Sequence, residues 1–159
     1  MQKKGCRNVH WINPDTWKTE REACGKLSLK NKHFSNTTDM SFYDGLIKYP
    51  RYHKQAKGIC SRIDHISPDK YLQESARIHF AEKDIKIDSK EILRDMAKVE
   101  ASRVDKKYVN LYYQQAKKGS KMPLPVLDYR ENSQEGRHRA VVAKKLGLKK
   151  IPVLVVEGC

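Results

Sequence analysis

The stretch NSQEGRHRAVVAKKLG, near the end of the sequence, concentrates the residues that could do chemistry. Gly136, Arg137, His138 and Arg139 lie at the start of a predicted helix, where free backbone N–H groups and the helix dipole favour an anion. Arginines at this end of a helix are unfavourable for the helix itself unless an anion such as phosphate accompanies them. We therefore expect these four residues to bind the phosphate of a nucleotide or nucleic acid.

Glu135 and His138 are the candidate catalytic pair of this segment. An unperturbed histidine titrates near neutral pH and suits general acid–base catalysis. Glu135 could act as a base, as a ligand of Mg²⁺, or only as the helix cap. The structural alternative is that Glu135 caps the helix, His138 is exposed, and both arginines pair with acids such as Asp128 and Glu131.

The elements around this segment predict a compact α+β or α/β unit. KMPLPVLDYR reads as an extended segment and ENS as a turn. A helix over QEGRHRAVVAKKLG follows, and Gly147 ends it. The run KKIPVLVVEG is almost wholly apolar, which predicts a final strand that is buried on both faces.

Three further helices are predicted upstream. Ser67 and Pro68 form a typical helix start, Ser89 begins a second helix, and Asp105 and Gly119 bound a third. In the second helix we expect burial of Ile92, Met96, Val99 and Val104, and in the third of Tyr108, Leu111, Tyr112 and Gln115. Ile63 and Ile66 are the candidates for burial in the segment RIDHI.

Residues 1–58 show little periodicity. DTWKTEREACGKL predicts a short helix that ends at Gly25, and SNTTDMSFYDGLIKY predicts another that starts near Asp39 or Ser41. The cysteine spacing does not indicate a disulfide framework, and Cys6, His10, Cys24 and His33 are spaced too widely for a usual zinc site, so we expect free thiols.

Composition limits the class of protein. A chain of 159 residues suits one domain with an extension, and its net charge of +14 indicates a polyanionic partner. The excess charge is divided evenly before and after Cys60. No apolar run is long enough for a membrane span, and the N-terminus has no secretory h-region, so we expect a cytoplasmic protein without a membrane partner.

The block MPLPVLDYRENSQEGRHRAVVAKKLGLKKIPVLVV resembles the ParB/sulfiredoxin superfamily. Glu135, Arg137, Arg139 and Ala140 fall on the matching positions of the ParB-like box Gly-Glu-Arg-Arg-x-Arg-Ala, while Gln134 and Gly136 replace its Gly and first Arg. In the sulfiredoxin box Gly-Gly-Cys-His-Arg, the matches are Gly136, His138 and Arg139. Arg137 occupies the position of the catalytic cysteine, which makes sulfinic acid reduction improbable because that chemistry needs a thiolate. EGRHR also matches the Asp-Gly-x-His-Arg box of the free serine kinases, with Glu for Asp.

The resemblance extends from near Ser61 to Val156 and implies a ParB/sulfiredoxin-like domain over residues 59–159, with residues 1–58 as an extension. It implies a small α+β fold that binds a nucleotide or phosphate at this helix N-terminus. The first hypothesis is a DNA-associated protein, of a kind often encoded by phages, with or without nuclease activity. The alternatives are a phosphotransferase or NTPase that uses Mg²⁺ with ATP or CTP, and a non-catalytic module that binds a protein partner.

Overall fold

The protein is built around a small mixed sheet that four strands form in the order β3-β6-β4-β5. The computed structural model describes residues 10–13, 18–21, 29–48 and 59–158. The strands of the sheet are β3 (Ile59–Ile66), β4 (Val126–Asp128), β5 (Ser133–Glu135) and β6 (Ile151–Gly158). β6 is antiparallel to β3 and parallel to β4, and β5 is antiparallel to β4. The predicted α+β class with a small mixed sheet is confirmed.

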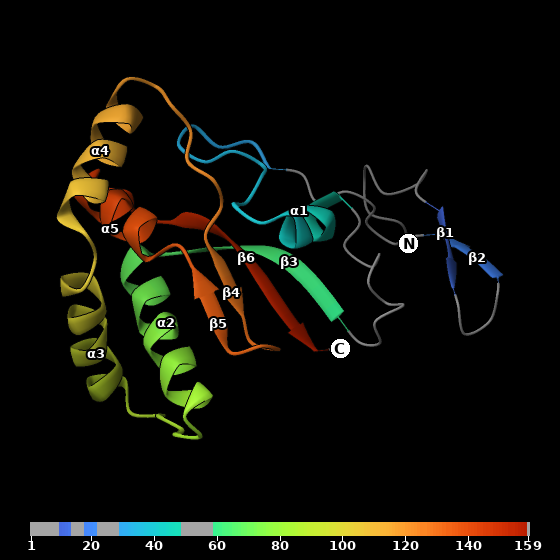
Figure 1. Ribbon diagram of the computed structural model, residues 1–159, viewed down its shortest axis with the longest axis horizontal. Helices are drawn as coiled ribbons and strands as arrows, with labels where there is room; N and C mark the ends of the chain where they lie inside the picture. Colours follow the sequence, from blue (N-terminus) through green and yellow to red (C-terminus); the bar gives the residue numbers. More distant parts are fainter. Residues whose placement is uncertain (1–9, 14–17, 22–28, 49–58, 159) are drawn as a thin grey trace.

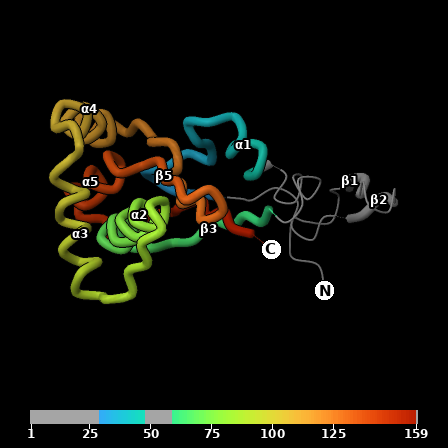
Figure 2. The backbone as a smooth tube through the Cα atoms, turned by 60° about the horizontal axis from the view of Figure 1, so that its bottom comes forward, coloured from blue at the N-terminus to red at the C-terminus, as the bar shows by residue number. Residues whose placement is uncertain are grey.

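Four helices gather at one side of this sheet (Figure 1). They are α2 (Pro68–Glu82), α3 (Lys90–Ser102), α4 (Lys106–Lys117) and α5 (Arg137–Lys145). α2 packs on both α3 and α5, and α4 packs on α5. The shorter α1 (Ser41–Lys48) lies apart from them in both views of the backbone (Figures 1 and 2) and contacts β3.

The predicted starts of α2, α3 and α4 and the predicted ends of α4 and α5 depend on local capping chemistry, and the structure confirms them. The side chains of Ser67, Ser89 and Asp105 each accept a hydrogen bond from a first-turn amide of the helix that follows. Gly119 and Gly147 lie just beyond the ends of α4 and α5 with φ of +95° and +77°. Positive φ is accessible to glycine at little cost, so these residues stop the helices as expected.

The buried face of α3 differs from the prediction. Of the four residues expected to be buried, Val104 is buried and Met96 partly buried, whereas Ile92 and Val99 are exposed. The residues that α3 itself buries are Leu93, Ala97 and Glu100. The helix carries two apolar ridges that are offset by one residue, and packing against α2 selects the second of them. Because a helix turns by about 100° per residue, this offset brings a glutamate to the interior.

The prediction for α4 was also wrong in its buried face. Tyr108, Leu111 and Gln115 are exposed and Tyr112 is only partly buried, while Val109 and Ala116 are buried. Small and branched side chains allow α4 to approach α5 closely, and the larger tyrosines lie at the edge of this contact.

Two short strands replace predicted helix or turn. β2 (Lys18–Arg21) lies within the helix expected over residues 15–25 and pairs antiparallel with β1 (His10–Asn13). β5 occupies residues for which a turn and the start of a helix were expected, and the helix itself begins at Arg137. In both cases, pairing with a neighbouring strand overrides local propensity.

Residues 29–48 contribute to the same core as the sheet and helices. Phe34, Leu46 and Ile47 are almost fully buried in the cluster that contains β6. The N–H of Met122 donates to the carbonyl of His33 at 2.8 Å, beside an isolated parallel bridge between Phe34 and Met122. The expected helix near Ser41 is α1. Part of the segment assigned to the extension therefore packs into the folded unit.

Cys60 on β3 is disulfide-bonded, so the expectation of free thiols is wrong for this residue. Of the residues considered for zinc, the side chains of Cys6, His10 and Cys24 lie outside the described residues. Ile63 and Ile66 are partly buried against the core. None of the helices in the described part of the chain is long and apolar enough to cross a membrane.

Candidate functional site

The N-terminus of α5 is held against the sheet by Gly136, its N-cap residue. Gly136 has φ of +142°, and a Cβ at this position would lie 2.6 Å from the Pro125 Cβ and 3.1 Å from the Tyr71 hydroxyl. Only glycine fits this conformation and this close approach. The helix has no side-chain N-cap, so its first-turn amides keep their capacity to donate to an anion.

Arg139 lies in the first turn of α5. Its side chain is buried and connects this helix to neighbouring segments of the chain. Its Nη1 donates to Asp39 at 2.6 Å, and its Nη2 donates to the carbonyls of Leu124 and Glu135, both at 3.2 Å. Nη2 also forms an ion pair with the Glu135 carboxylate. Burial opposes the charge of Arg139, but Glu135 and Asp39 outweigh it and raise the pKa of the guanidinium. The charged groups of Arg139 and Glu135 are therefore paired with each other inside the fold.

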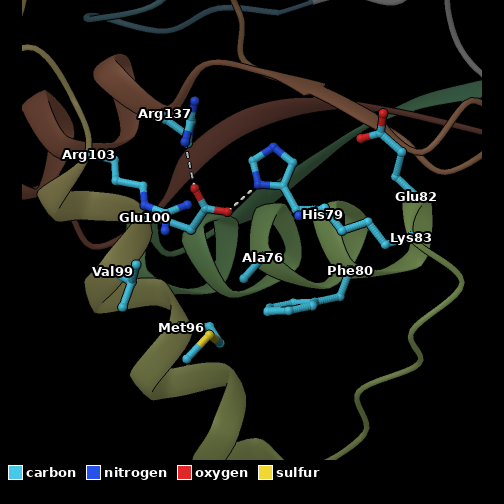
Figure 3. A pocket seen from close by; sticks show the side chains of 10 residues that line it. All are labelled: Ala76, His79, Phe80, Glu82, Lys83, Met96, Val99, Glu100, Arg103 and Arg137. Carbon is cyan, nitrogen blue, oxygen red and sulfur yellow. Dashed lines mark hydrogen bonds and ion pairs between the residues drawn. The ribbon is translucent and has the colours of Figure 1, made fainter.

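Arg137 points to the other side of the helix start and pairs with Glu100 of α3. Its Nη1 donates to Glu100 Oε2 at 2.7 Å. Glu100 is 5% exposed, and its second carboxylate oxygen is hydrogen-bonded to Nδ1 of His79 on α2. Figure 3 shows the Glu100 carboxylate between Arg137 and His79. This buried carboxylate thus joins three helices.

The Arg137–Glu100–His79 cluster forms one end of a cavity of about 560 Å³ between α2 and α3. Ala76, Phe80, Met96 and Val99 supply apolar lining, and the exposed charged residues at the cavity are Lys83, Arg103 and the acid Glu82 (Figure 3). A volume of several hundred cubic ångströms with an apolar wall and few convergent polar groups is typical of a small-molecule site.

His138 faces α4 instead of the cavity. Its Nε2 accepts a hydrogen bond from the Asp105 amide at 2.9 Å, and its ring meets Tyr108 edge to face at 6.0 Å. Burial, and then the nearby charge of Arg137, lower the pKa of this imidazole. No hydrogen bond joins His138 to Glu135 within the described residues, so the structure does not bring the expected catalytic pair into direct contact.

The structure therefore separates the five predicted site residues. Gly136 shapes the turn, Glu135 and Arg139 pair with each other, His138 binds α4, and Arg137 lines the cavity. The alternative pairing of the arginines with Asp128 and Glu131 is not found: these two acids instead pair with Arg130.

Four residues at the cavity were not predicted from the sequence as site residues: His79, Glu100, Lys83 and Arg103. A signal for Glu100 was present, because Leu93, Ala97 and Glu100 share helical spacing, and a glutamate in an apolar stripe needs a partner. His79 and the two cations have no comparable signal in the sequence.

Both carboxylates of the site are paired with basic side chains in this structure. Glu135 is engaged by Arg139 and Glu100 by Arg137 and His79. Across the described ranges, no group of three or more His, Cys, Asp or Glu side chains has a geometry that could hold a metal ion.

No protein-family model, curated protein or solved structure matches the chain. The resemblance to the ParB/sulfiredoxin superfamily stays a prediction from the residues quoted for it.

Proposed function

We propose that this protein is a nucleic-acid-binding protein that contacts phosphate with the N-terminus of α5 and with Arg137. The observation that carries the proposal is the state of Arg137. This residue begins a helix without a side-chain N-cap, lines the cavity, and uses only Nη1 in hydrogen bonds within the described residues. A guanidinium carries five N–H donors, so most of its donors are available to a phosphate.

The surroundings of Arg137 support an anionic ligand. Arg103 and Lys83 border the same cavity, and the chain as a whole carries a net charge of +14. Glu100 reduces the local charge, but it also fixes Arg137 in place, so that little side-chain entropy is lost when a phosphate binds. The apolar wall with Phe80 and Met96 suits the face of a base or the edge of a sugar.

The His79–Glu100 pair favours nuclease activity as the chemistry of this site. A carboxylate that accepts from Nδ1 fixes the tautomer in which Nε2 is a free base. In our proposal Nε2 of His79 takes a proton from a water molecule whose oxygen attacks phosphorus. The P–O ester bond breaks, and the departing oxygen takes a proton from solvent. Arg137 stabilises the additional negative charge on the phosphoryl oxygens.

The test is binding of a fluorescein-labelled DNA oligonucleotide, followed by anisotropy between 50 and 200 mM salt, a range in which phosphate contacts weaken steeply. The variant is Arg137→Gln, which removes the charge but keeps an amide donor for Glu100. The control is Lys149→Gln, which removes one charge from an exposed position beyond the other end of α5. We expect weaker binding and a salt slope that is lower by about 0.7–0.9 for Arg137→Gln alone. Equal slopes for both variants would contradict the proposal.

A nucleotide is the alternative ligand of the same cavity. Thermal shift with ATP, CTP and GTP in Mg²⁺ separates the two, because a ligand at 100 times its Kd stabilises the protein by about 2.7 kcal/mol. Stabilisation by one nucleotide that Arg137→Gln abolishes, without DNA binding, would favour the phosphotransferase or NTPase hypothesis. His79→Asn would abolish cleavage of DNA but not its binding if the proposed chemistry is correct.

A further inference from the structure

We infer that the outer face of α4 is a binding surface for single-stranded nucleic acid, which the protein holds by base stacking and phosphate contacts. We call it the α4 face and define it by Lys107, Tyr108, Leu111, Tyr112 and Lys118. The inference deepens the proposed function and rests on it for the class of ligand.

The α4 face is apolar and open. Tyr108 and Leu111 are 53% and 50% exposed. They are three residues apart and therefore lie next to each other on the same side of the helix. The helix buries its other side, with Val109 and Ala116, against α5. Exposed aromatic and aliphatic side chains in a contiguous strip mark a site of interaction.

The charge of α4 selects the partner. Lys106 and Lys107 begin the helix, and Lys117 and Lys118 end it. The sequence from Lys106 to Lys118 contains no aspartate or glutamate. Both ends of the apolar strip are thus cationic, and the acid next to them is Asp105, the N-cap residue of α4. An apolar protein partner would not need this pattern, whereas a chain of phosphates with exposed bases complements it.

The two tyrosines form an ordered stacking surface. The rings of Tyr108 and Tyr112 lie 6.4 Å apart with an angle of 26° between their planes. Tyr112 is partly buried against the core and supports the exposed ring of Tyr108. Base–aromatic stacking contributes about 1–3 kcal/mol per base and tolerates any base.

The α4 face borders the start of α5, the helix that carries Arg137. The rings of Tyr108 and His138 form an edge-to-face pair at 6.0 Å, and His138 follows Arg137 at the start of α5. A helix of this length spans about 18 Å, which corresponds to about five stacked nucleotides. A single strand of about this length can therefore lie along α4.

The preference for single strands follows from stacking. Bases in a duplex already stack on one another and present only their edges, so Tyr108 has no free base face to cover. Unpaired bases expose that face, and a flexible backbone can follow the lysines at both ends of the helix.

The experiment measures anisotropy of a fluorescein-labelled 20-nucleotide thymidine oligomer and of a duplex of the same length at 50 mM salt. The variants are Tyr108→Ala and Tyr108→Trp, and the control is Ile92→Ala, which truncates a comparably exposed apolar side chain on α3. We expect Tyr108→Ala to weaken single-strand binding about 5- to 100-fold, with Tyr108→Trp and Ile92→Ala close to wild type. Single-strand affinity of Tyr108→Ala within twofold of wild type would overturn the inference.

Two further measurements separate this inference from the proposed function. If Tyr108→Ala leaves affinity unchanged while Arg137→Gln lowers it, the α4 face is refuted and the phosphate site stands. If Arg137→Gln has no effect but Tyr108→Ala has, the α4 face stands and the site at α5 fails. A dimer that Leu111→Glu converts to a monomer, with unchanged oligonucleotide affinity, would assign the face to a second copy and overturn the inference.

Discussion

The Arg137 guanidinium on α5 and the Glu100 carboxylate on α3 form an ion pair at 2.7 Å that links two of the four helices beside the sheet. The side chain of Glu100 is only 6% exposed, whereas that of Arg137 is 28% exposed. The acid is therefore almost fully desolvated, and the arginine only in part. The buried Glu100 carboxylate is fixed in place, so the ion pair orients the Arg137 guanidinium toward the cavity.

Loss of the Glu100 carboxylate should destabilise the protein. Glu100→Ala leaves Arg137 and His79 without their shared acceptor, and we expect the free energy of unfolding to fall by about 2 kcal/mol. Both partners are partly exposed, so water offsets some of the loss. Glu91→Ala, an exposed acid on the same helix, should change stability by less than about 1 kcal/mol. Urea denaturation measures both, and equal effects would show that the buried cluster does not contribute to stability.

Gly136 should tolerate no side chain. In Gly136→Ala the new Cβ meets the Pro125 Cβ at 2.6 Å and the Pro125 Cα at 2.8 Å, and φ is +142°. We expect a loss of about 3 kcal/mol or more, because backbone atoms have to move. Gly119→Ala also has positive φ but has no atom within 4 Å of the new Cβ, so a loss of about 1 kcal/mol is expected.

The difference between these two glycine variants isolates steric overlap from backbone strain. Thermal unfolding followed by circular dichroism gives it directly, at about 2–4 °C per kcal/mol for a chain of this size. A Gly136→Ala protein that melts together with Gly119→Ala would mean that α5 can shift away from Pro125.

Much of the fold was predictable because it depends on neighbours in sequence. The caps at Ser67, Ser89 and Asp105 act within three residues, and the apolar run after Lys150 identifies β6. The three residues of β5 are polar and carry no periodicity, so only their pairing with β4 defines them.

The site was less predictable because its contacts are distant in sequence. Arg137 was selected from the sequence, but its partner Glu100 lies 37 residues away on a helix with two competing apolar ridges. Arg139 is also an arginine and lies only two residues after Arg137, yet its side chain is buried. Residues two apart on a helix point about 200° away from each other, and the packing of the whole domain decides which of the two faces inward.

Arg139 should therefore act on stability. Arg139→Met removes the donors to Asp39, Glu135 and the Leu124 carbonyl, and we expect a loss of about 2–4 kcal/mol. Lys144→Met on the same helix breaks an exposed pair with Asp69 and should lower stability by less than about 1 kcal/mol. Urea denaturation measures the loss.

The same two variants test the earlier expectation that Arg139 binds phosphate. If its role is structural, the folded fraction of Arg139→Met should bind DNA with the salt slope of the wild-type protein. A slope that is lower by about 0.7–0.9 would instead assign a phosphate contact to this residue.

His138 should make stability depend on pH in the mildly acidic range. The pKa of His138 is lower in the folded protein than in the unfolded chain, where it is about 6.5. The unfolded state therefore binds more protons below this pH, so the contribution of His138 is complete above about pH 6.5. It is lost as the pH falls toward the folded pKa. Protonation of Nε2 would also break the hydrogen bond from the Asp105 amide.

The measurement is the urea midpoint at pH 7.5 and pH 5.5 for the wild type, His138→Gln and His65→Gln. His138→Gln keeps a carbonyl that can accept from Asp105 but does not titrate, so its two midpoints should lie closer together than those of the wild type. His65 is exposed on β3, and its replacement should leave the wild-type difference in place. If His138→Gln retains the full wild-type difference, protonation of His138 is not linked to folding. The packing of α4 on α5 would then not depend on its neutral form.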